Sequence, residues 1–163
     1  PMPQVSTVPP EALPQIPSAL QVEHRVIHEA LLRATKAPGD IGTAARELAG
    51  ALHDHFVREE EIALPPLGLL AALARGAFTP EMRAVLPMTE ALRAELPRML
   101  DEHQAIHAAT RRLGEVARKA GNAEVQQLAE ALALHAQSEE EVFYPAALLV
   151  GEVVESRSQA HGS

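Results

Sequence analysis

The sequence predicts an all-α protein whose core is an antiparallel up-down-up-down four-helix bundle. The chain has 163 residues, of which 47% are hydrophobic and only 2% aromatic. That composition suits one globular domain and disfavours strand-rich folds. Apolar residues recur three and four positions apart over long stretches, as on one face of an α-helix. Two parts of the chain also match each other at an offset of 79 or 80 residues. We therefore expect a bundle built from two repeated helical hairpins.

A proline-rich arm should precede the first helix. Residues 1–17 contain six prolines, which exclude a regular α-helix and favour an extended chain. The helical pattern begins at Ser18 and should continue to about Lys36. Pro38 and Gly39 follow immediately, and this pair is typical of a helix end.

The second helix should lead into a long connection. Asp40 or Thr43 can cap its start, and two consecutive prolines should stop it near Leu64. Residues 65–98 contain further prolines and predict an irregular, partly helical connection. This connection lies within the predicted bundle domain, residues 18–150.

The third and fourth helices should form the second hairpin. The third is predicted over 97–120, and the Gly121–Asn122 pair should end it and start the next. The fourth should cover 123–149, with Pro145 as a kink or a stop. Residues 151–163 are polar and predict a flexible tail.

Two polar motifs occur in both halves of the chain. They are Glu23-His24-x-x-Ile27-His28, repeated as Glu102-His103-x-x-Ile106-His107, and His55-x-x-x-Glu59-Glu60-Glu61, repeated as His135-x-x-x-Glu139-Glu140-Glu141. In the second and fourth helices, the histidine and the first glutamate continue a stripe of inward-facing leucines. Eight polar side chains should therefore point toward the middle of one bundle: His24, His28, His55, Glu59, His103, His107, His135 and Glu139.

A metal centre explains why so many polar groups occupy core positions. Each unpaired buried polar group costs roughly 1–3 kcal/mol, so eight of them would unfold an ordinary bundle. Imidazoles and carboxylates are good iron ligands, and a cation offsets the carboxylate charge. The intervals from His28 to His55 and from His107 to His135 are nearly equal, which brings the four ligand-bearing turns to one level. Two copies of a half-site imply two metals with a carboxylate from each half between them.

Several neighbouring residues admit more than one interpretation. Glu60 and Glu140 are most simply solvent-facing, and either could replace the preceding glutamate as a ligand. His53 and His161 fall away from the ligand positions, and we expect them to be bystanders. Tyr144 could pack in the core, or could serve as a hydrogen-bonding or redox group.

These motifs resemble the hemerythrin-like family, also called HHE cation-binding domains, over about residues 20–147. The resemblance implies a four-helix bundle holding a non-heme di-iron centre, with two iron ions joined by two carboxylates and an oxo or hydroxo group. It implies one set of ligands in order along the chain: His24, His55, Glu59, His103, His107, His135, and Glu139 or, as in the oxygen carriers, Glu140. Family members bind dioxygen reversibly or act in oxygen, iron or redox sensing.

His28 departs from the pattern of the oxygen carriers, which have an apolar residue there. If His28 coordinates, each iron has three histidines and its positions are filled. We therefore expect His28 to close the open site, and His28→Phe to create or strengthen an oxygen adduct.

The expected function is binding or sensing of dioxygen or a related small ligand, nitric oxide or peroxide. This describes a metal- and oxygen-binding protein more than an enzyme. The alternatives are a di-iron redox enzyme for peroxide reduction or iron oxidation, and a metal-dependent regulatory module without catalysis. A redox partner is compatible with these functions. Ferritin-like di-iron proteins are set aside, because no histidine here has a glutamate three residues before it.

Charge and hydropathy limit the other partners and the location. The net charge of −8 and the pI near 5.5 disfavour a nucleic-acid surface. No apolar run approaches the ~20 residues that span a bilayer, so we expect no membrane contact. Without cysteine or a secretory signal at the N-terminus, the expected location is cytoplasmic.

Overall fold

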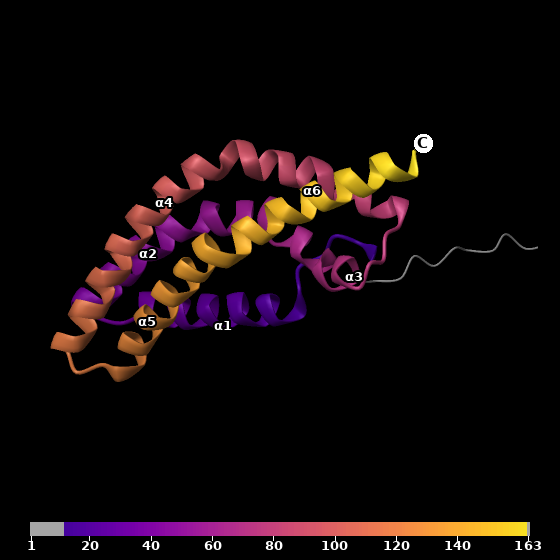
Figure 1. Cartoon of the computed structure of the whole chain (residues 1–163). Coiled ribbons are helices and arrows are strands. Elements are labelled where there is room, and N and C mark those ends of the chain that lie inside the picture. The colour runs from indigo at the N-terminus through magenta and orange to yellow at the C-terminus, as the bar shows by residue number, and fades with distance from the viewer. Residues whose placement is uncertain (1–11, 163) are drawn as a thin grey trace, which may run out of the picture.

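The computed structural model describes residues 12–162 and confirms an all-α four-helix bundle (Figure 1). Its four helices are α1 (Ser18–Thr35), α2 (Gly39–Arg58), α4 (Leu86–Lys119) and α5 (Ala123–Ser138). Each packs against the next along the chain, and α5 returns to contact α1, which closes the bundle. Residues 1–11, most of the predicted proline-rich arm, lie outside the described residues.

The two hairpin turns use glycines that adopt left-handed backbone conformations. Gly39 has φ +70° at the start of α2, and Gly121 has φ +67° between α4 and α5. Asn122 then caps α5 by accepting a hydrogen bond from the Val125 amide at 3.1 Å, as the sequence predicts. The start of α2 differs, because no side chain caps it and the chain reverses at Gly39 instead.

The connection between the hairpins is more helical than expected. It contains the 3₁₀-helix η3 (Pro65–Leu69), the short α3 (Leu70–Ala74) and the 3₁₀-helix η4 (Pro80–Val85). Helix α4 then starts at Leu86 instead of near residue 97. Pro97 is accommodated inside α4, where it removes one backbone hydrogen bond and its ring displaces the carbonyl four residues back. Figure 1 shows the bend in α4 that such a residue causes.

The fourth helical segment is also longer than the sequence suggests. After α5 comes the π-helix η5 (Glu139–Phe143), and α6 (Tyr144–His161) continues without a break. Pro145 lies in the first turn of α6, where a missing N–H is harmless. The segment expected to be a flexible tail is therefore helical, and its Val154 is fully buried. Helix α6 packs on α4, η3 and η4, beyond the four-helix bundle itself.

A polar layer separates the apolar cores of the molecule. One core lies toward the hairpin turns and includes Leu31, Leu48 and Leu128. Another lies toward α6 and includes Leu64 and Met99. Along each of the four bundle segments, the buried histidines and glutamates lie between the residues of one core and the residues of the other. Among the described residues, no helix is both long and apolar enough to cross a membrane.

Candidate metal centre

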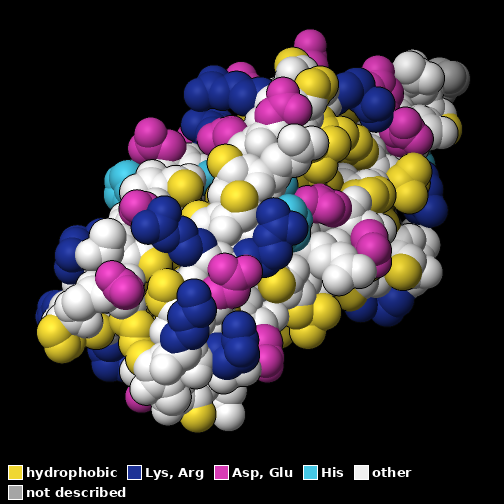
Figure 2. Space-filling view, turned by 90° about the vertical axis from the view of Figure 1, so that its left-hand side faces the viewer, with side chains coloured by type: hydrophobic (Ala, Val, Ile, Leu, Met, Phe, Trp, Pro, Cys, Tyr) yellow, Lys and Arg dark blue, Asp and Glu magenta, His cyan; other side chains and the backbone are white. Residues whose placement is uncertain are grey.

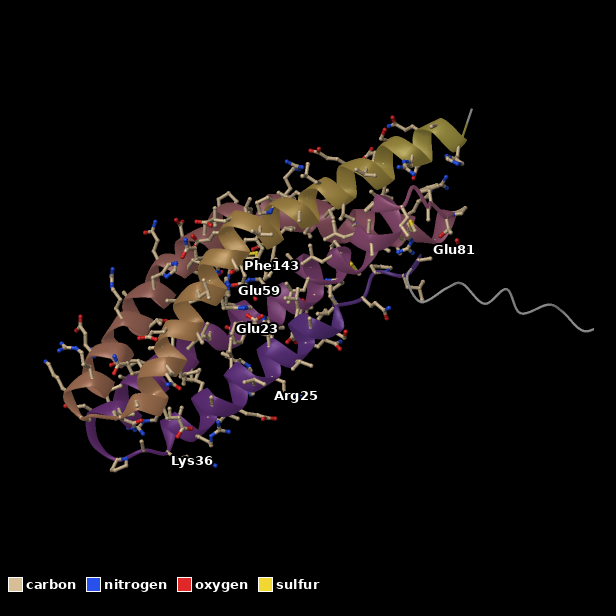
Figure 3. The ribbon with its side chains drawn as sticks, turned by 60° about the horizontal axis from the view of Figure 1, so that its bottom comes forward. Glu23, Arg25, Lys36, Glu59, Glu81 and Phe143 are labelled. Atoms are coloured by element: carbon tan, nitrogen blue, oxygen red, sulfur yellow. The ribbon has the colours of Figure 1, made fainter. Side chains whose placement is uncertain are left out.

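Six buried side chains from all four bundle helices form the polar layer, and we call them the inner residues. They are His24 on α1, His55 on α2, Glu59 at the start of the π-helix η2 (Glu59–Ala63), His103 on α4, His135 on α5 and Glu139 at the start of η5. None of the six is more than 6% exposed. Figure 3 shows Glu59 in the middle of the bundle, while Arg25 of α1 points away from it.

Each inner glutamate is the first residue of a π-helix that ends two residues before a proline. In η2 the Leu64 amide donates to the Glu59 carbonyl at 2.9 Å, one residue further back than in an α-helix. Pro65 and Pro145 explain the two wide turns, because a proline ring clashes with the carbonyl four residues back and cannot donate to it. Such π-turns are frequent at functional sites. Here the two π-turns begin at Glu59 and Glu139.

The inner histidines form two pairs across the bundle. In the first pair, Nε2 of His24 lies 2.9 Å from Nε2 of His135. In the second pair, Nε2 of His55 lies 2.8 Å from Nε2 of His103. Each pair, together with both inner glutamates, forms a group of four residues whose ligand atoms lie within 4.8 Å of one another. The two groups therefore share both carboxylates.

Each inner carboxylate directs one oxygen to each histidine pair. Glu59 places Oε1 2.5 Å from a nitrogen of the second pair and Oε2 3.6 Å from a nitrogen of the first. Glu139 places Oε1 3.5 Å from a nitrogen of the second pair and Oε2 3.4 Å from one of the first. This is the arrangement that two carboxylates need to bridge two cations.

The inner residues fit cations better than they fit one another. Two nitrogens 2.9 Å apart suit a shared ion, because imidazole nitrogens lie ~2.1 Å from a first-row divalent metal. Oε2 of Glu59 and Oε2 of Glu139 are buried without any hydrogen-bond partner. Buried polar atoms are normally paired, so these two oxygens indicate missing ligands. The nitrogen and oxygen donor set matches the preference of iron and similar metals.

The pKa values of the inner residues reflect their burial and their closeness to one another. Burial raises the pKa of Glu59, but hydrogen bonds from Glu139, His103 and His55 outweigh it and hold this pKa well below its usual range. Burial and the neighbouring Glu59 charge raise the pKa of Glu139 well above its usual range. Glu139 therefore holds a proton more readily than Glu59, and cations would compete with that proton. Burial lowers the pKa of His24, whereas hydrogen bonds to Glu59 and Glu140 outweigh burial and raise that of His103.

Four further glutamates surround the inner residues, and we call them the outer carboxylates. Each approaches the Nδ1 of one inner histidine: Glu23 at 2.5 Å from His135, Glu60 at 3.5 Å from His24, Glu102 at 3.9 Å from His55 and Glu140 at 2.8 Å from His103. Glu23 and Glu140 are within hydrogen-bond distance, and partners of this kind fix the ring so that Nε2 faces the centre. Nδ1 of His24 and Nδ1 of His55 have no hydrogen-bond partner among the described residues. Glu23 and Glu102 were not predicted as part of the site, although each directly precedes an inner histidine at the same position of its copy of the repeat.

Aromatic residues make the two histidine pairs unequal. The Tyr144 hydroxyl donates to Oε1 of Glu59 at 2.7 Å and lies 3.1 Å from Nε2 of His103. Burial and the nearby Glu59 and Glu139 raise the pKa of Tyr144, so its hydroxyl stays protonated. The ring of Phe56 lies beside the first pair, 4.8 Å from the ring of His24.

The remaining predicted ligands are more exposed than the inner residues, and of the two only His107 belongs to a group of donor atoms with one of them, His103. His28 is exposed on α1 and belongs to none of the groups of donor atoms found among the described residues. His107 contacts Glu140 instead, with its Nε2 3.1 Å from the Glu140 carboxylate. Burial raises the pKa of Glu140, but hydrogen bonds from His103 and His107 outweigh it and lower this pKa. His53 and His161 also lie outside those groups.

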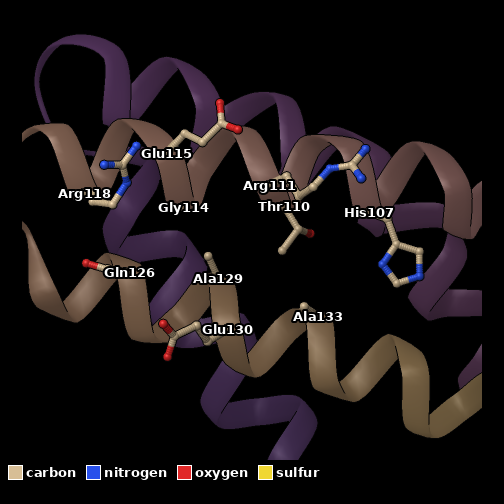
Figure 4. A pocket seen from close by; sticks show the side chains of 10 residues that line it. All are labelled: His107, Thr110, Arg111, Gly114, Glu115, Arg118, Gln126, Ala129, Glu130 and Ala133. Carbon is tan, nitrogen blue, oxygen red and sulfur yellow. The ribbon is translucent and has the colours of Figure 1, made fainter.

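Two cavities open near the centre. A cleft of about 550 Å³ between α1 and α2 is lined mainly by apolar side chains and reaches His24, Phe56 and Glu60. A second cavity, of about 390 Å³, lies between α4 and α5 and ends at His107. In Figure 4, Thr110 points into the gap between the helices and His107 stands at one end. The first cleft is the one that reaches an inner residue.

The surface carries charges of both signs. On the face shown in Figure 2, Lys and Arg side chains alternate with Asp and Glu, and no broad basic patch stands out. This face therefore lacks the feature that a nucleic-acid surface usually shows.

Comparison with known proteins gives one match. The family model described as the hemerythrin HHE cation binding domain matches residues 15–147, which contain all of the inner residues and outer carboxylates. Searches of curated proteins and of solved structures returned no match.

Proposed function

Because this chain belongs to the hemerythrin HHE cation-binding domain family, we propose that it is a non-heme di-iron protein that binds or senses dioxygen or a related small ligand. The family and the buried histidine and glutamate groups make it a metal-binding protein. We propose in addition that the metal is a pair of irons and that this pair binds a small ligand.

The observation that carries the proposal is the division of each inner carboxylate between two histidine pairs. We assign one ion to His24 and His135 and the other to His55 and His103, with Glu59 and Glu139 shared. Each ion then has four protein ligands. Iron commonly takes more ligands than four, so each ion keeps room for a further bridge and for a small exogenous ligand.

The protein residues would bind, orient and shield such a centre. Glu23 and Glu140 orient the imidazoles of His135 and His103. The apolar cores on either side exclude bulk water from the polar layer. The iron ions would supply reversible redox chemistry and affinity for diatomic ligands. The α1–α2 cleft offers a route for a small uncharged molecule to the His24 side, because its lining is mainly apolar. Tyr144 donates a hydrogen bond on the His55 side.

Metal analysis with matched variants tests the centre itself. We expect two irons per chain in the wild type and near-ultraviolet charge-transfer absorption typical of a bridged ferric pair. Glu59→Gln and Glu139→Gln should each lower the iron content to one or less, because the lost charge belongs to both ions. Glu141→Gln is the control, since Glu141 is exposed and accepts its hydrogen bond from Gln137. One zinc per chain, or unchanged iron in both inner variants, would overturn the proposal.

Spectra of the reduced protein distinguish binding from catalysis. A visible band that appears under oxygen or nitric oxide and disappears when the gas is removed supports ligand binding. Oxidation without any adduct would instead favour the redox enzyme, and peroxide consumption or iron oxidation by the loaded protein would then be measured. A loaded protein that responds to none of these ligands would leave the metal-dependent regulatory module.

A further inference from the structure

The cavity between α4 and α5 is large enough for a small organic molecule. Its volume of about 390 Å³ falls within the ~300–1,000 Å³ that is typical of small-molecule sites. Gly114 of α4 and Ala129 and Ala133 of α5 line it, and none of them has a side chain longer than a methyl group. The space that they leave begins beside His107 and extends toward the hairpin turn, away from the inner residues (Figure 4).

A buried hydroxyl without a partner faces this cavity. Thr110 is 3% exposed, and its Oγ1 has no hydrogen-bond partner among the described residues. In Figure 4 its side chain points into the gap between the two helices. The sequence repeat pairs Thr110 with Leu31, which packs in an apolar core of the first half. Because a leucine would leave no buried polar atom unpaired, the hydroxyl of Thr110 indicates a ligand with a polar group at this position.

An arginine without an ion-pair partner lies next to this hydroxyl along α4. Arg111 lines the cavity and is exposed, and it forms no ion pair with another residue in the part of the chain that the structure describes. The next residue, Arg112, differs because it pairs with Glu47 of α2 at 3.4 Å. A guanidinium without such a partner is suited to bind a carboxylate through two parallel N–H bonds.

The charges along the cavity favour an anion at one end only. In Figure 4, Arg118, Glu115 and Glu130 gather at the end toward the hairpin turn, where charges of opposite sign offset one another. Arg111 lies toward the other end, beside Thr110. A ligand would therefore place a negative group at Arg111 and an uncharged, apolar part between Gly114 and Ala129.

We propose that this cavity binds a small organic carboxylate, whose carboxylate group is held by Arg111 and Thr110 and whose apolar body packs on Gly114 and Ala129. The guanidinium and the hydroxyl both donate hydrogen bonds to the carboxylate oxygens. The apolar body displaces water from the small side chains between the helices. None of these four residues belongs to the inner residues or the outer carboxylates, so this site does not depend on the proposed di-iron function.

Calorimetric titration of the full chain with phenylacetate tests the charge of the ligand. We expect one saturable site per chain, and about tenfold weaker binding of phenylacetamide, which has the same shape without the charge. Arg111→Ala should weaken phenylacetate binding by about the same factor. Arg112→Ala is the matched control and should bind as the wild type does, because Arg112 pairs with Glu47 and does not line the cavity.

Two further variants test the cavity itself. Thr110→Val keeps the side-chain shape, and we expect it to weaken phenylacetate binding without lowering the urea midpoint, because the hydroxyl has no partner to lose within the described residues. Ala133→Phe should fill the cavity and abolish binding. Ala131→Phe is its control on the same helix, since Ala131 is exposed and does not line the cavity.

The outcomes that would overturn this inference are distinct from those that concern the metal. No saturable binding of either phenylacetate or hexanoate overturns the site, and so does phosphate that binds as tightly as these carboxylates. A lower urea midpoint in Thr110→Val shows that the hydroxyl has a partner within the protein, and also overturns it. Binding that is lost in chelator would place the carboxylate on the metal instead. A chain that holds no metal but binds phenylacetate contradicts the proposed function alone.

Discussion

At the scale of single residues, Tyr144 makes the surroundings of the two histidine pairs different. Its hydroxyl donates to Glu59 on the side of His55 and His103. The sequence repeat places Leu64 at the equivalent position of the first half, and Leu64 is fully buried in the apolar core. The two halves therefore place different side chains around similar histidines and glutamates.

Replacing Tyr144 by Phe tests this hydrogen bond. The ring still fills its place, but Oε1 of Glu59 loses a donor in a buried site, which costs about 1–3 kcal/mol. We expect the free energy of unfolding of the metal-free protein to fall by that amount in urea titrations. The iron content should stay at two per chain while the charge-transfer absorption shifts. Unchanged stability and an unchanged spectrum would show that the hydroxyl has no influence on the centre.

Glu23→Gln tests the role of the outer carboxylates. Glu23 holds Nδ1 of His135, and removing its charge makes His135 a weaker ligand. Loss of such a partner typically weakens metal binding about 10–100-fold, and we expect the lower part of this range because Gln keeps an acceptor. Competition with a coloured chelator measures the affinity. Glu29→Gln, an exposed change on the same helix, is the control, and equal affinities for both variants would contradict the assignment.

Among the features of the candidate site, the positions of the inner residues were the most predictable from the sequence. The helical spacing placed His55 and Glu59 on the core stripe, and the structure buries both. The same spacing could not tell which histidine of a His-x-x-x-His pair faces the centre, because both lie on one helix face. The structure turns His24 inward and leaves His28 exposed. That choice depends on the depth of the polar layer along α1, which only the packed bundle sets.

At the scale of elements, the backbone near the prolines was the hardest part to predict. The sequence predicts Pro145 as a kink or a stop in the fourth helix. In the structure, a π-turn before Pro145 absorbs the steric conflict and the chain stays helical. Pro97 is likewise held inside α4 because tertiary packing outweighs the local penalty. The segment after Gly151 is polar overall, but its Val154 packs with buried apolar residues of η3, α3 and η4, which docks it there.

The docking of α6 on α4 depends on one glycine. A Cβ on Gly151 would lie 2.3 Å from Oγ1 and 2.7 Å from Cβ of Thr89, both in the neighbouring helix. We expect Gly151→Val to destabilise the protein by about 1–3 kcal/mol through overpacking. Gly50→Ala is the matched helical control, because a Cβ there meets open space, and it should stabilise α2 by about 0.5–1 kcal/mol. Thermal or urea unfolding measures both, and equal effects would show that α6 is not closely docked.

At the scale of the whole molecule, we expect the polar layer to make stability depend on metal. The four buried histidines and two buried glutamates divide the apolar core. Without cations, burial and the nearby Glu59 charge raise the pKa of Glu139. The apolar cores on both sides should keep the metal-free chain folded. Its folded state is nevertheless strained by two carboxylate oxygens that lack partners.

Removing metal should therefore lower the melting temperature without abolishing helicity. Cations that bind only the folded chain stabilise it by about 4 kcal/mol when present at a thousand times their dissociation constant. We expect calorimetry to show a higher transition in anaerobic Fe²⁺ than in chelator, and Glu59→Gln to lose most of this difference. The difference should shrink as the pH falls, because protons compete with the cations for the imidazoles and carboxylates. A transition that is the same in chelator and in iron would mean that the polar layer is stable without metal, and would contradict a metal centre built from these six residues.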